Sequence, residues 1–148
     1  MKVVFTSQEH VSAAAHILHL AYYSSLASAQ KELIKKIKTK ESLVALEKNK
    51  VIGVLNYTKN YSHYANYIED ICVSQAHRKK GVAKILLQKY ISLSKKQTPQ
   101  KQKYALSSTD VSNTISLAMH RSFGFKEIGR IKALHYGKDE IIFGYDLR

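Results

Sequence analysis

Cysteine and proline are almost absent from this sequence of 148 residues, which contains one of each. The single thiol, Cys72, excludes an internal disulfide, and no Cys-x-x-Cys pair or cluster of histidine and cysteine marks a zinc site. The seven histidines are scattered along the chain, so we predict no bound metal. No apolar run approaches the roughly 18 residues that a membrane span needs.

The apolar run at the start of the chain, Val3 to Phe5, turns polar at Thr6 and is too short for a signal peptide. We therefore expect a cytoplasmic protein with no membrane partner. The length fits one domain spanning residues 1–148, and 45% hydrophobic with 24% charged residues is typical of a soluble globular chain.

Acidic residues are also scarce, 11 against 24 lysines and arginines, which leaves a net charge of +13. Such a charge is compatible with a nucleic-acid surface, an acidic partner or a polyanionic ligand. The lysines are spread through the chain, however, and no aromatic residues alternate with them as in a platform that stacks bases. We interpret the charge as a basic solvated surface and expect no nucleic-acid partner.

Hydrophobic periodicity predicts strands and helices in the order β-α-α-β-β-β-α-β-α-β-β. We expect strands at residues 3–5, 42–47, 51–57, 67–73, 103–108, 126–131 and 140–147. We expect helices after a Thr6-x-x-Glu9 capping box, at residues 29–38 with Leu33, Ile34 and Ile37 as the apolar side, from Val82 to before Pro99, and at residues 113–122. The strand, helix and strand within 67–108 predict a parallel crossover in an otherwise largely antiparallel sheet.

The most informative stretch is a basic loop between the strand that ends at Val73 and the long helix, with the sequence Arg78-Lys79-Lys80-Gly81-Val82-Ala83. Glycine lets the backbone approach a ligand closely, and the N–H groups of a first helical turn attract phosphate. The loop lacks the glycine patterns of dinucleotide folds and NTPases. The alternative interpretation is an ordinary helix start whose lysines lie in solvent.

Two patterns in the sequence resemble the GNAT N-acetyltransferase superfamily. The first, Arg78-x-x-Gly81-x-Ala83, resembles the family's acetyl-coenzyme A signature Gln/Arg-x-x-Gly-x-Gly/Ala. The family's last helix and its Gly-Phe exit are similar to the pattern Asn113-x-x-Ser116-x-x-Met119-His120-x-x-x-Gly124-Phe125. The hairpin that ends in Val51-Ile52-Gly53 also resembles the family's middle strands.

This resemblance implies an α/β fold with a mixed, largely antiparallel sheet of six to seven strands and about four helices. Its fourth and fifth strands would be parallel and would splay apart to admit acetyl-coenzyme A, the acyl donor. The pantetheine arm would pair with the backbone of Ile71 and Val73, and a backbone N–H near Cys72 or Val73 would stabilise the negative charge on the thioester oxygen.

The pyrophosphate would lie on N–H groups of the basic loop, which are those of Arg78, Lys79, Lys80, Gly81, Val82, Ala83 and Lys84. Because this recognition is mostly through the main chain, the side chains of Lys79, Lys80 and Val82 would be free to vary. Asn113 and Ser116 complete the implied cofactor-binding set. Asparagine equally suits a helix N-cap, and both roles are compatible.

Transfer to a primary amine requires a base, because the amine has a pKa near ~10.4 and is protonated at neutral pH. Glu69 is the first candidate, since Glu69-Asp70 looks like the Glu-Asp pair of polyamine and thialysine acetyltransferases. Strand alternation places Asp70 on the opposite face as the second candidate. Alternatively, Glu69 is a strand-edge carboxylate in water or paired with a lysine.

His120 stands where many members of the family have a tyrosine that protonates the departing sulfur. A histidine is a suitable acid for this step, with an unperturbed pKa near ~6.5. The alternative is a histidine on the polar side of the helix with no chemical role. Cys72 is interpreted as a buried strand residue rather than a nucleophile. Tyrosines, notably Tyr57, Tyr61, Tyr64 and Tyr67, either line an acceptor pocket or pack within strands.

We therefore expect a transferase, specifically an N-acetyltransferase, whose acceptor is a small-molecule amine such as a polyamine, amino acid or aminoglycoside, or a protein amine. The first alternative is a non-catalytic acyl-coenzyme A binding module, and the second is a nucleic-acid binder driven by charge. The sequence does not identify the acceptor, and a homodimer is left open.

Overall fold

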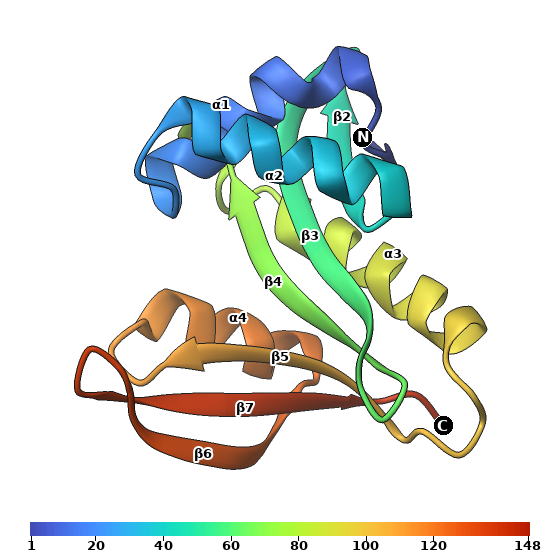
Figure 1. Ribbon diagram of the computed structural model, residues 1–148, viewed down its shortest axis with the longest axis vertical. Helices are drawn as coiled ribbons and strands as arrows, with labels where there is room; N and C mark the ends of the chain where they lie inside the picture. The colour runs from blue at the N-terminus through green and yellow to red at the C-terminus, as the bar shows by residue number, and fades with distance from the viewer. The chain divides into compact units, whose positions relative to one another are not determined.

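Hydrogen bonding joins the strands into a seven-stranded sheet in the order β1-β2-β3-β4-β5-β7-β6 (Figure 1). The computed structural model describes residues 1–148 and gives the strands β1 Lys2–Phe5, β2 Ser42–Glu47, β3 Lys50–Ser62, β4 Ala65–Val73, β5 Tyr104–Asp110, β6 Lys126–His135 and β7 Lys138–Asp146. The helices are α1 Val11–Ala21, α2 Leu26–Thr39, α3 Val82–Gln97 and α4 Thr114–Phe123, with the short 3₁₀ segments η1 Gln8–His10 and η2 Gln75–His77. The predicted order of strands and helices is confirmed.

Strand directions also agree with the sequence. The pairs β1–β2, β2–β3, β5–β7 and β6–β7 are antiparallel. The pair β4–β5 is parallel, with Tyr67 opposite Leu106. The fold is therefore mixed α/β with a largely antiparallel sheet, as predicted.

The chain divides into two compact units. Unit 1 comprises Met1–Thr58 and Glu69–Tyr90, and unit 2 comprises Lys59–Ile68 and Ile91–Arg148. The expectation of one domain over residues 1–148 stays a prediction.

Three local predictions were wrong. The cap before the first helix uses Ser7, whose N–H donates to His10 Nδ1 at 3.1 Å, while the Thr6 hydroxyl instead bonds Ser42 Oγ at 2.6 Å. The second helix begins earlier than predicted because Ser25 accepts a hydrogen bond from the N–H of Ser28. The strands expected at 51–57 and 67–73 are longer than predicted and form a hairpin, since β3 ends at Ser62 and β4 begins at Ala65.

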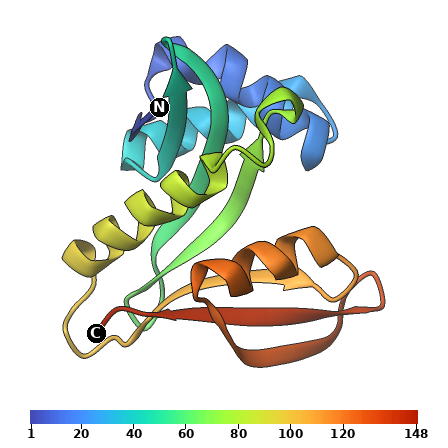
Figure 2. The ribbon, with the colours of Figure 1, turned by 180° about the vertical axis from the view of Figure 1, so that it is seen from behind.

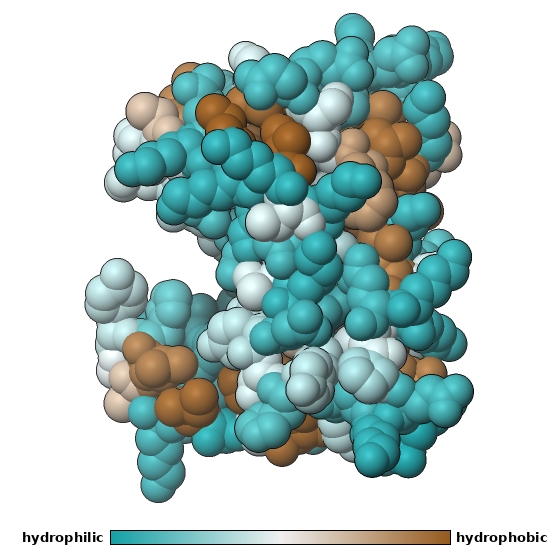
Figure 3. Space-filling view, turned by 45° about the vertical axis from the view of Figure 1, so that its right-hand side comes forward, coloured by the Kyte–Doolittle hydropathy of each residue, from teal (hydrophilic) through white to brown (hydrophobic).

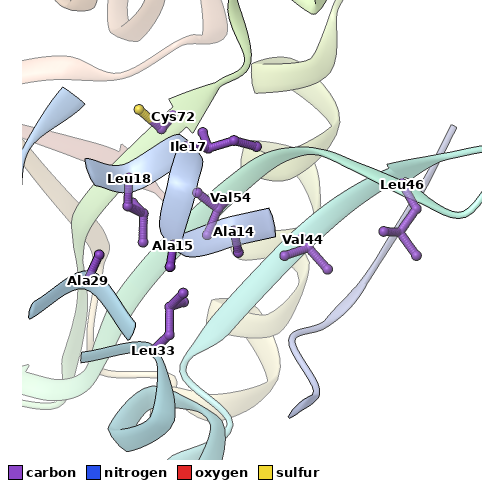
Figure 4. Packing of buried hydrophobic residues seen from close by; sticks show 10 residues of the cluster. All are labelled: Ala14, Ala15, Ile17, Leu18, Ala29, Leu33, Val44, Leu46, Val54 and Cys72. Carbon is purple, nitrogen blue, oxygen red and sulfur yellow. The ribbon is translucent and has the colours of Figure 1, made fainter. Parts of the chain in front are cut away.

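The core of unit 1 lies between α1, α2 and the strands below them. Small and branched side chains from these elements form one cluster, shown in Figure 4: Ala14, Ala15, Ile17, Leu18, Ala29, Leu33, Val44, Leu46, Val54 and Cys72. The first half of α3 lies on the other side of β3, as comparison of Figures 1 and 2 shows. The strands of unit 1 are thus covered on both faces.

The core of unit 2 is aromatic. His120 of α4 stacks on Phe143 of β7 with 4.7 Å between ring centroids, and Phe125 meets the same imidazole edge-on at 5.3 Å. Figure 2 shows α4 in front of β5 and β7, so this helix covers one face of the strands of unit 2.

The face of the molecule seen in Figure 3 is largely polar. In the view of Figure 3, hydrophilic side chains predominate and hydrophobic ones are scattered among them. The interpretation of the +13 charge as a solvated basic surface stays a prediction. None of the helices is both long and apolar enough to cross a membrane.

Gly53 of β3 allows α3 to approach the strand closely. A Cβ at this position would lie 2.8 Å from Val82 Cγ1 and 3.2 Å from Leu86 Cδ1, both on α3. The first two turns of α3 therefore rest directly on the backbone of β3.

We predict that Gly53→Ala lowers the free energy of unfolding by ~1–3 kcal/mol, because the added methyl group overpacks the contact between β3 and α3. Gly129→Ala is a matched control in another strand, where the new Cβ would lie 3.8 Å from Ile142 Cβ, an ordinary contact. Urea unfolding of both variants measures the difference. Equal changes in the free energy of unfolding of the two variants would show that the close approach at Gly53 does not contribute to stability.

Candidate functional site

The loop that opens α3 has an unusual backbone. After η2, Arg78 is extended and its Nε donates to Val73 O at 3.4 Å. Lys79 and Gly81 both have positive φ, 59° and 81°. A Cβ at Gly81 would meet nothing within 4 Å, so open space lies beside the chain at this glycine.

The N–H groups that follow this turn are free for a ligand. The first N–H groups of a helix have no partner within it, and here Ile85 N donating to Gly81 O at 3.2 Å is the bond that begins α3. The positive end of the helix dipole lies at the same place. Lys79 and Lys80 are exposed, so the loop concentrates N–H donors and positive charge, as an anion site requires.

One prediction about this loop was wrong. Val82 was expected to vary freely, but its side chain is only 1% exposed and packs over Gly53. Only the backbone N–H of Val82 is left for a ligand, and its side chain belongs to the core.

The last residues of β4 lead into this loop. Ile71 and Val73 are half-buried, and the Ile71 carbonyl accepts a hydrogen bond from Tyr22 OH at 3.0 Å. The Cys72 thiol is buried, and burial raises its pKa to about 11. This thiol is therefore neutral at physiological pH, and the prediction that Cys72 is a buried strand residue is confirmed.

Asp70 lies in a buried polar cluster of unit 1. Its Oδ2 accepts hydrogen bonds from Asn56 Nδ2 at 3.0 Å and from Tyr23 OH at 2.9 Å. Burial raises the pKa of Asp70 above its usual range, and the hydrogen bonds oppose this only in part. The pKa of Tyr23 is raised as well, by burial and then by the Asp70 charge, so its hydroxyl stays a donor. The Asn56 Oδ1 atom is buried and has no hydrogen-bond partner.

Glu69 has a different environment. Its Oε2 lies 2.6 Å from Lys36 Nζ, and its Oε1 accepts a hydrogen bond from Thr58 Oγ1. The Lys36 side chain is only 7% exposed, and its ammonium also donates to Tyr57 O at 2.9 Å and to Thr58 Oγ1 at 2.8 Å. The alternative that Glu69 pairs with a lysine thus describes what the structure contains.

Sequence reasoning missed Lys36. The predicted apolar side of the second helix held Leu33, Ile34 and Ile37, but Ile34 is exposed and Lys36 is buried in its place. The spacing from Ala29 to Leu33 to Lys36 follows one face of a helix, which was the available signal. A lysine on a buried stripe requires a partner, and that partner is Glu69.

His120 lies in unit 2 and is 1% exposed, so the alternative that placed it on the polar side of its helix was wrong. Its Nδ1 lies 2.7 Å from Ser116 O, which can only accept, so Nδ1 carries the hydrogen. The Nε2 atom then accepts from Ser107 Oγ at 2.7 Å. Burial lowers the pKa of His120, so the imidazole is neutral at physiological pH.

The helix cap predicted for Asn113 is confirmed, because its Oδ1 accepts from the N–H of Ser116 at 3.1 Å. The predicted site residues therefore fall into two groups. Both carboxylates, the end of β4 and the basic loop lie in unit 1, whereas Asn113, Ser116 and His120 lie together around α4 in unit 2.

The family of the protein follows from its match to a family model. Residues 11–125 match the model of the acetyltransferase (GNAT) family, which is more than half of the chain. The protein belongs to the GNAT acetyltransferase family. It is accordingly an acyltransferase, as the resemblance implied.

Solved structures agree with GNAT membership. A GNAT family acetyltransferase from Bacillus cereus ATCC 10987 is 25% identical, with a TM-score of 0.82 over 98% of this chain and 96% of that one. The ribosomal-protein-alanine N-acetyltransferase from Brucella melitensis is 19% identical, with a TM-score of 0.80 over 99% of both chains. An aminoglycoside 6'-N-acetyltransferase complexed with coenzyme A is 11% identical, with a TM-score of 0.82 over 100% of this chain and 98% of that one. The last two similarities show the fold alone.

A comparison with curated proteins finds no match for this GNAT acetyltransferase.

The buried imidazole predicts a pH dependence of stability for this GNAT acetyltransferase. The pKa of His120 is lowered in the folded state. Below about pH 6.5 the unfolded chain therefore binds a proton at this residue that the native state does not bind. The free energy of unfolding should therefore fall as pH drops from 7.5 to 5, by at most ~1.4 kcal/mol per pH unit from this residue.

Urea unfolding over that pH range should show this component lost in His120→Gln and kept in His16→Gln, a control on the exposed surface of α1. A wild-type pH dependence that survives in His120→Gln would contradict the assignment of a buried neutral imidazole.

Proposed function

We propose that this GNAT acyltransferase transfers an acetyl group from acetyl-coenzyme A directly to a primary amine, with both substrates bound at once. The observation that carries the proposal is the turn from Arg78 to Lys84. It combines two positive-φ residues, open space at Gly81 and the free N–H groups of α3.

The residues present fit acetyl-coenzyme A. The pyrophosphate would be held by backbone N–H groups from Arg78 to Lys84, with positive charge added by the exposed lysines. A side chain at position 81 would project into the space beside these groups, which explains a glycine there. The main chain of Ile71 and Val73 would pair with the pantetheine amides in the manner of an added strand. Asn113 and Ser116 are proposed to contact the cofactor in addition to capping α4.

When bound, acetyl-coenzyme A supplies an acetyl group activated as a thioester. The amine nitrogen forms a bond to the acetyl carbon while the carbon–sulfur bond breaks, and the sulfur leaves as coenzyme A. The proton lost by the amine goes to a carboxylate of the protein, directly or through water. This chain therefore has to position the amine and accept one proton.

Asp70 suits the role of proton acceptor better than Glu69. A general base works best when its pKa lies near the working pH, and burial moves the pKa of Asp70 in that direction. Both oxygens of Glu69 are already engaged, one by the buried Lys36 ammonium at 2.6 Å and the other by Thr58 Oγ1, so they are less available to take a proton from an amine. In this proposal the Lys36–Glu69 pair fixes the strand, and Tyr23 and Asn56 orient the Asp70 carboxylate.

His120 is supported more as a packing residue than as the acid for the leaving sulfur. Its neutral ring has both nitrogens engaged, by Ser107 and by the Ser116 carbonyl. Coenzyme A is a fair leaving group as a thiolate, so the transfer does not require an acid at this position.

The acceptor is proposed at the level of a primary amine. One similar structure is an aminoglycoside acetyltransferase and another acts on a ribosomal-protein alanine, so the shared fold accommodates both small molecules and protein amines. A cytoplasmic location is proposed with the same activity, since acetyl-coenzyme A is an intracellular metabolite.

The proposed role of the basic loop predicts how a methyl group added at Gly81 changes the binding of acetyl-coenzyme A. Gly81→Ala should weaken acetyl-coenzyme A binding about tenfold, equivalent to ~1.4 kcal/mol, because the new side chain occupies the space beside the N–H donors. Gly137→Ala is a matched control, since Gly137 has φ of 84° and the same open space around its Cβ. Both variants carry the same backbone strain, and calorimetric titration with acetyl-coenzyme A should separate them.

The result that would end the proposal is the absence of any binding heat with the wild-type protein, or equal affinities in Gly81→Ala and Gly137→Ala. Tight binding without release of free thiol, in the presence of a broad panel of amines, would favour a non-catalytic acyl-coenzyme A binding module.

The choice of Asp70 over Glu69 as the proton acceptor leads to a second prediction. Asp70→Asn should lower kcat by about 10²- to 10⁴-fold, the usual contribution of a general base. Wild-type kcat should rise with pH through the elevated pKa of Asp70, because only the ionised carboxylate accepts the proton. Thiol release under saturating acetyl-coenzyme A measures both.

Glu69→Gln alone leaves the buried Lys36 ammonium without a negatively charged partner, so Glu69 is better examined in the double variant Lys36→Met with Glu69→Gln. This pair should keep most of the wild-type kcat. If the double variant instead loses as much activity as Asp70→Asn, Glu69 takes the proton.

A further inference from the structure

We propose that the free edge of β1, together with the cavity beside it, binds an extended acidic peptide segment of a partner protein. This region is called here the β1 groove, and it is formed by β1, η1, the first turn of α1 and the turn between β2 and β3. All of these elements belong to unit 1. The proposal goes beyond the proposed function and does not rest on it.

The outer edge of β1 is open. This strand is the last one at its side of the sheet, and Figure 2 shows it beside the N-terminus, at the outer side of β2. Thr6 N donates to Ser42 O at 2.9 Å, which continues the β1–β2 register. Because peptide groups point alternately to the two sides of an antiparallel strand, those of Val4 also point to β2. Val3 and Phe5 therefore each offer one N–H and one C=O to an added strand.

A cavity of about 750 Å³ lies beside this edge. Its volume is within the roughly 300–1,000 Å³ that is typical of ligand pockets. Lys2 and Val4 line the cavity from one face of β1, and Phe5, whose side chain alternates to the other face, lines it as well. The cavity therefore reaches the edge of the strand, and together with the unpaired peptide groups it forms one groove.

Neighbouring strands give the groove an apolar floor. Leu46 of β2 lies opposite Lys2 of β1 and opposite Val51 of β3, and all three line the cavity. Val4 adds a further apolar side chain from β1, and Ala13 lines the cavity from α1. A peptide added to a sheet edge gains affinity from main-chain hydrogen bonds and specificity from pockets for alternate side chains. The β1 groove offers both.

The charge of the groove is positive. Lys2 and Lys50 line the cavity, are exposed, and take part in none of the salt bridges of the chain. The lining contains one acidic side chain, Glu9, whose Oε1 accepts a hydrogen bond from Ser7 Oγ at 3.2 Å and lies 3.8 Å from His10 Nε2. Two unpaired ammonium groups beside one engaged carboxylate favour an acidic ligand.

A peptide fits this edge better than a nucleic acid or a second copy of the chain. The C=O groups of Val3 and Phe5 need N–H donors, which a peptide backbone supplies at regular spacing and a phosphate backbone lacks. A second copy carries the same net charge of +13 and would bring its own Lys2 to the same edge. An acidic segment is instead attracted by the field of the whole protein.

The β1 groove is separate from the proposed place of acetyl transfer. β1 is three strands away from β4, which carries Asp70, and this corresponds to about 14 Å at the usual spacing of neighbouring strands. A peptide in the groove therefore leaves Asp70 and the basic loop accessible. Its role is to hold the protein on a partner while the other side of unit 1 stays free.

The test measures the binding of a fluorescein-labelled peptide of alternating glutamate and valine, with both ends capped, by fluorescence anisotropy. One control peptide has lysine in place of glutamate. The other keeps the glutamates but carries N-methylated valines, which cannot donate to a strand edge. Wild-type protein should bind the acidic peptide at least about tenfold more tightly than either control peptide.

Two pairs of variants locate the binding. Lys2→Gln with Lys50→Gln should lower the affinity for the acidic peptide about tenfold, whereas Lys31→Gln with Lys38→Gln, which removes the same charge from the exposed side of α2, should change it less than about twofold. Val3→Pro removes an outward N–H without touching the β1–β2 bonds and should lower the affinity about tenfold. Val3→Ala keeps this N–H and should bind within about twofold of wild type. Thermal unfolding checks that all variants fold.

Three results would overturn the inference. Equal affinity for the acidic peptide and its N-methylated form, or equal losses in the two lysine pairs, would show that only the general positive field attracts the peptide. A dimer that is present in wild type and lost in Val3→Pro, measured by analytical ultracentrifugation, would assign the edge to a second copy of the chain. None of these measurements involves acetyl transfer, so the inference and the proposed function fail separately.

Discussion

Unit 1 depends on the contact between the backbone of β3 at Gly53 and the first turns of α3. The absence of a side chain at Gly53 lets Val82 and Leu86 rest on the strand, so the beginning of the helix is fixed by core packing. The basic loop precedes this anchor directly. Its N–H groups are therefore held in place by a hydrophobic contact, although the loop itself is exposed and carries charge.

The adjacent carboxylates Glu69 and Asp70 on β4 have different properties because their neighbours differ. Lys36 pairs with Glu69 and makes two further oxygen contacts, to Tyr57 O and Thr58 Oγ1, which ties α2 to β3. Asp70 is buried among neutral donors, and the same polypeptide strand thus holds one carboxylate as an ion pair and one with a raised pKa. The chemical role of each carboxylate therefore depends on the residues that the tertiary fold places beside it.

The sequence predicted those features that depend on local pattern. The order of strands and helices, the parallel crossover, the Asn113 cap and the glycine turn before α3 all follow from periodicity and from short motifs. Long-range packing explains the failures. Lys36 was missed because its burial depends on Glu69, thirty-three residues away. The alternative that put His120 on the polar side of its helix failed because the local sequence gives no sign of Phe143, on which the imidazole stacks. The β3–β4 hairpin was shortened because its tip is tyrosine-rich and polar, without the alternation that a half-buried strand shows.

The burial of Cys72 determines how the protein reacts with thiol reagents. It is the only thiol of the chain, and in the folded protein it is covered and protonated, so it reacts slowly with alkylating or disulfide reagents. Such reagents would therefore detect thiols in solution without interference from the intact enzyme. Once the core of unit 1 opens, the same sulfur becomes reactive, and the rate of its labelling reports how often these helices and strands separate.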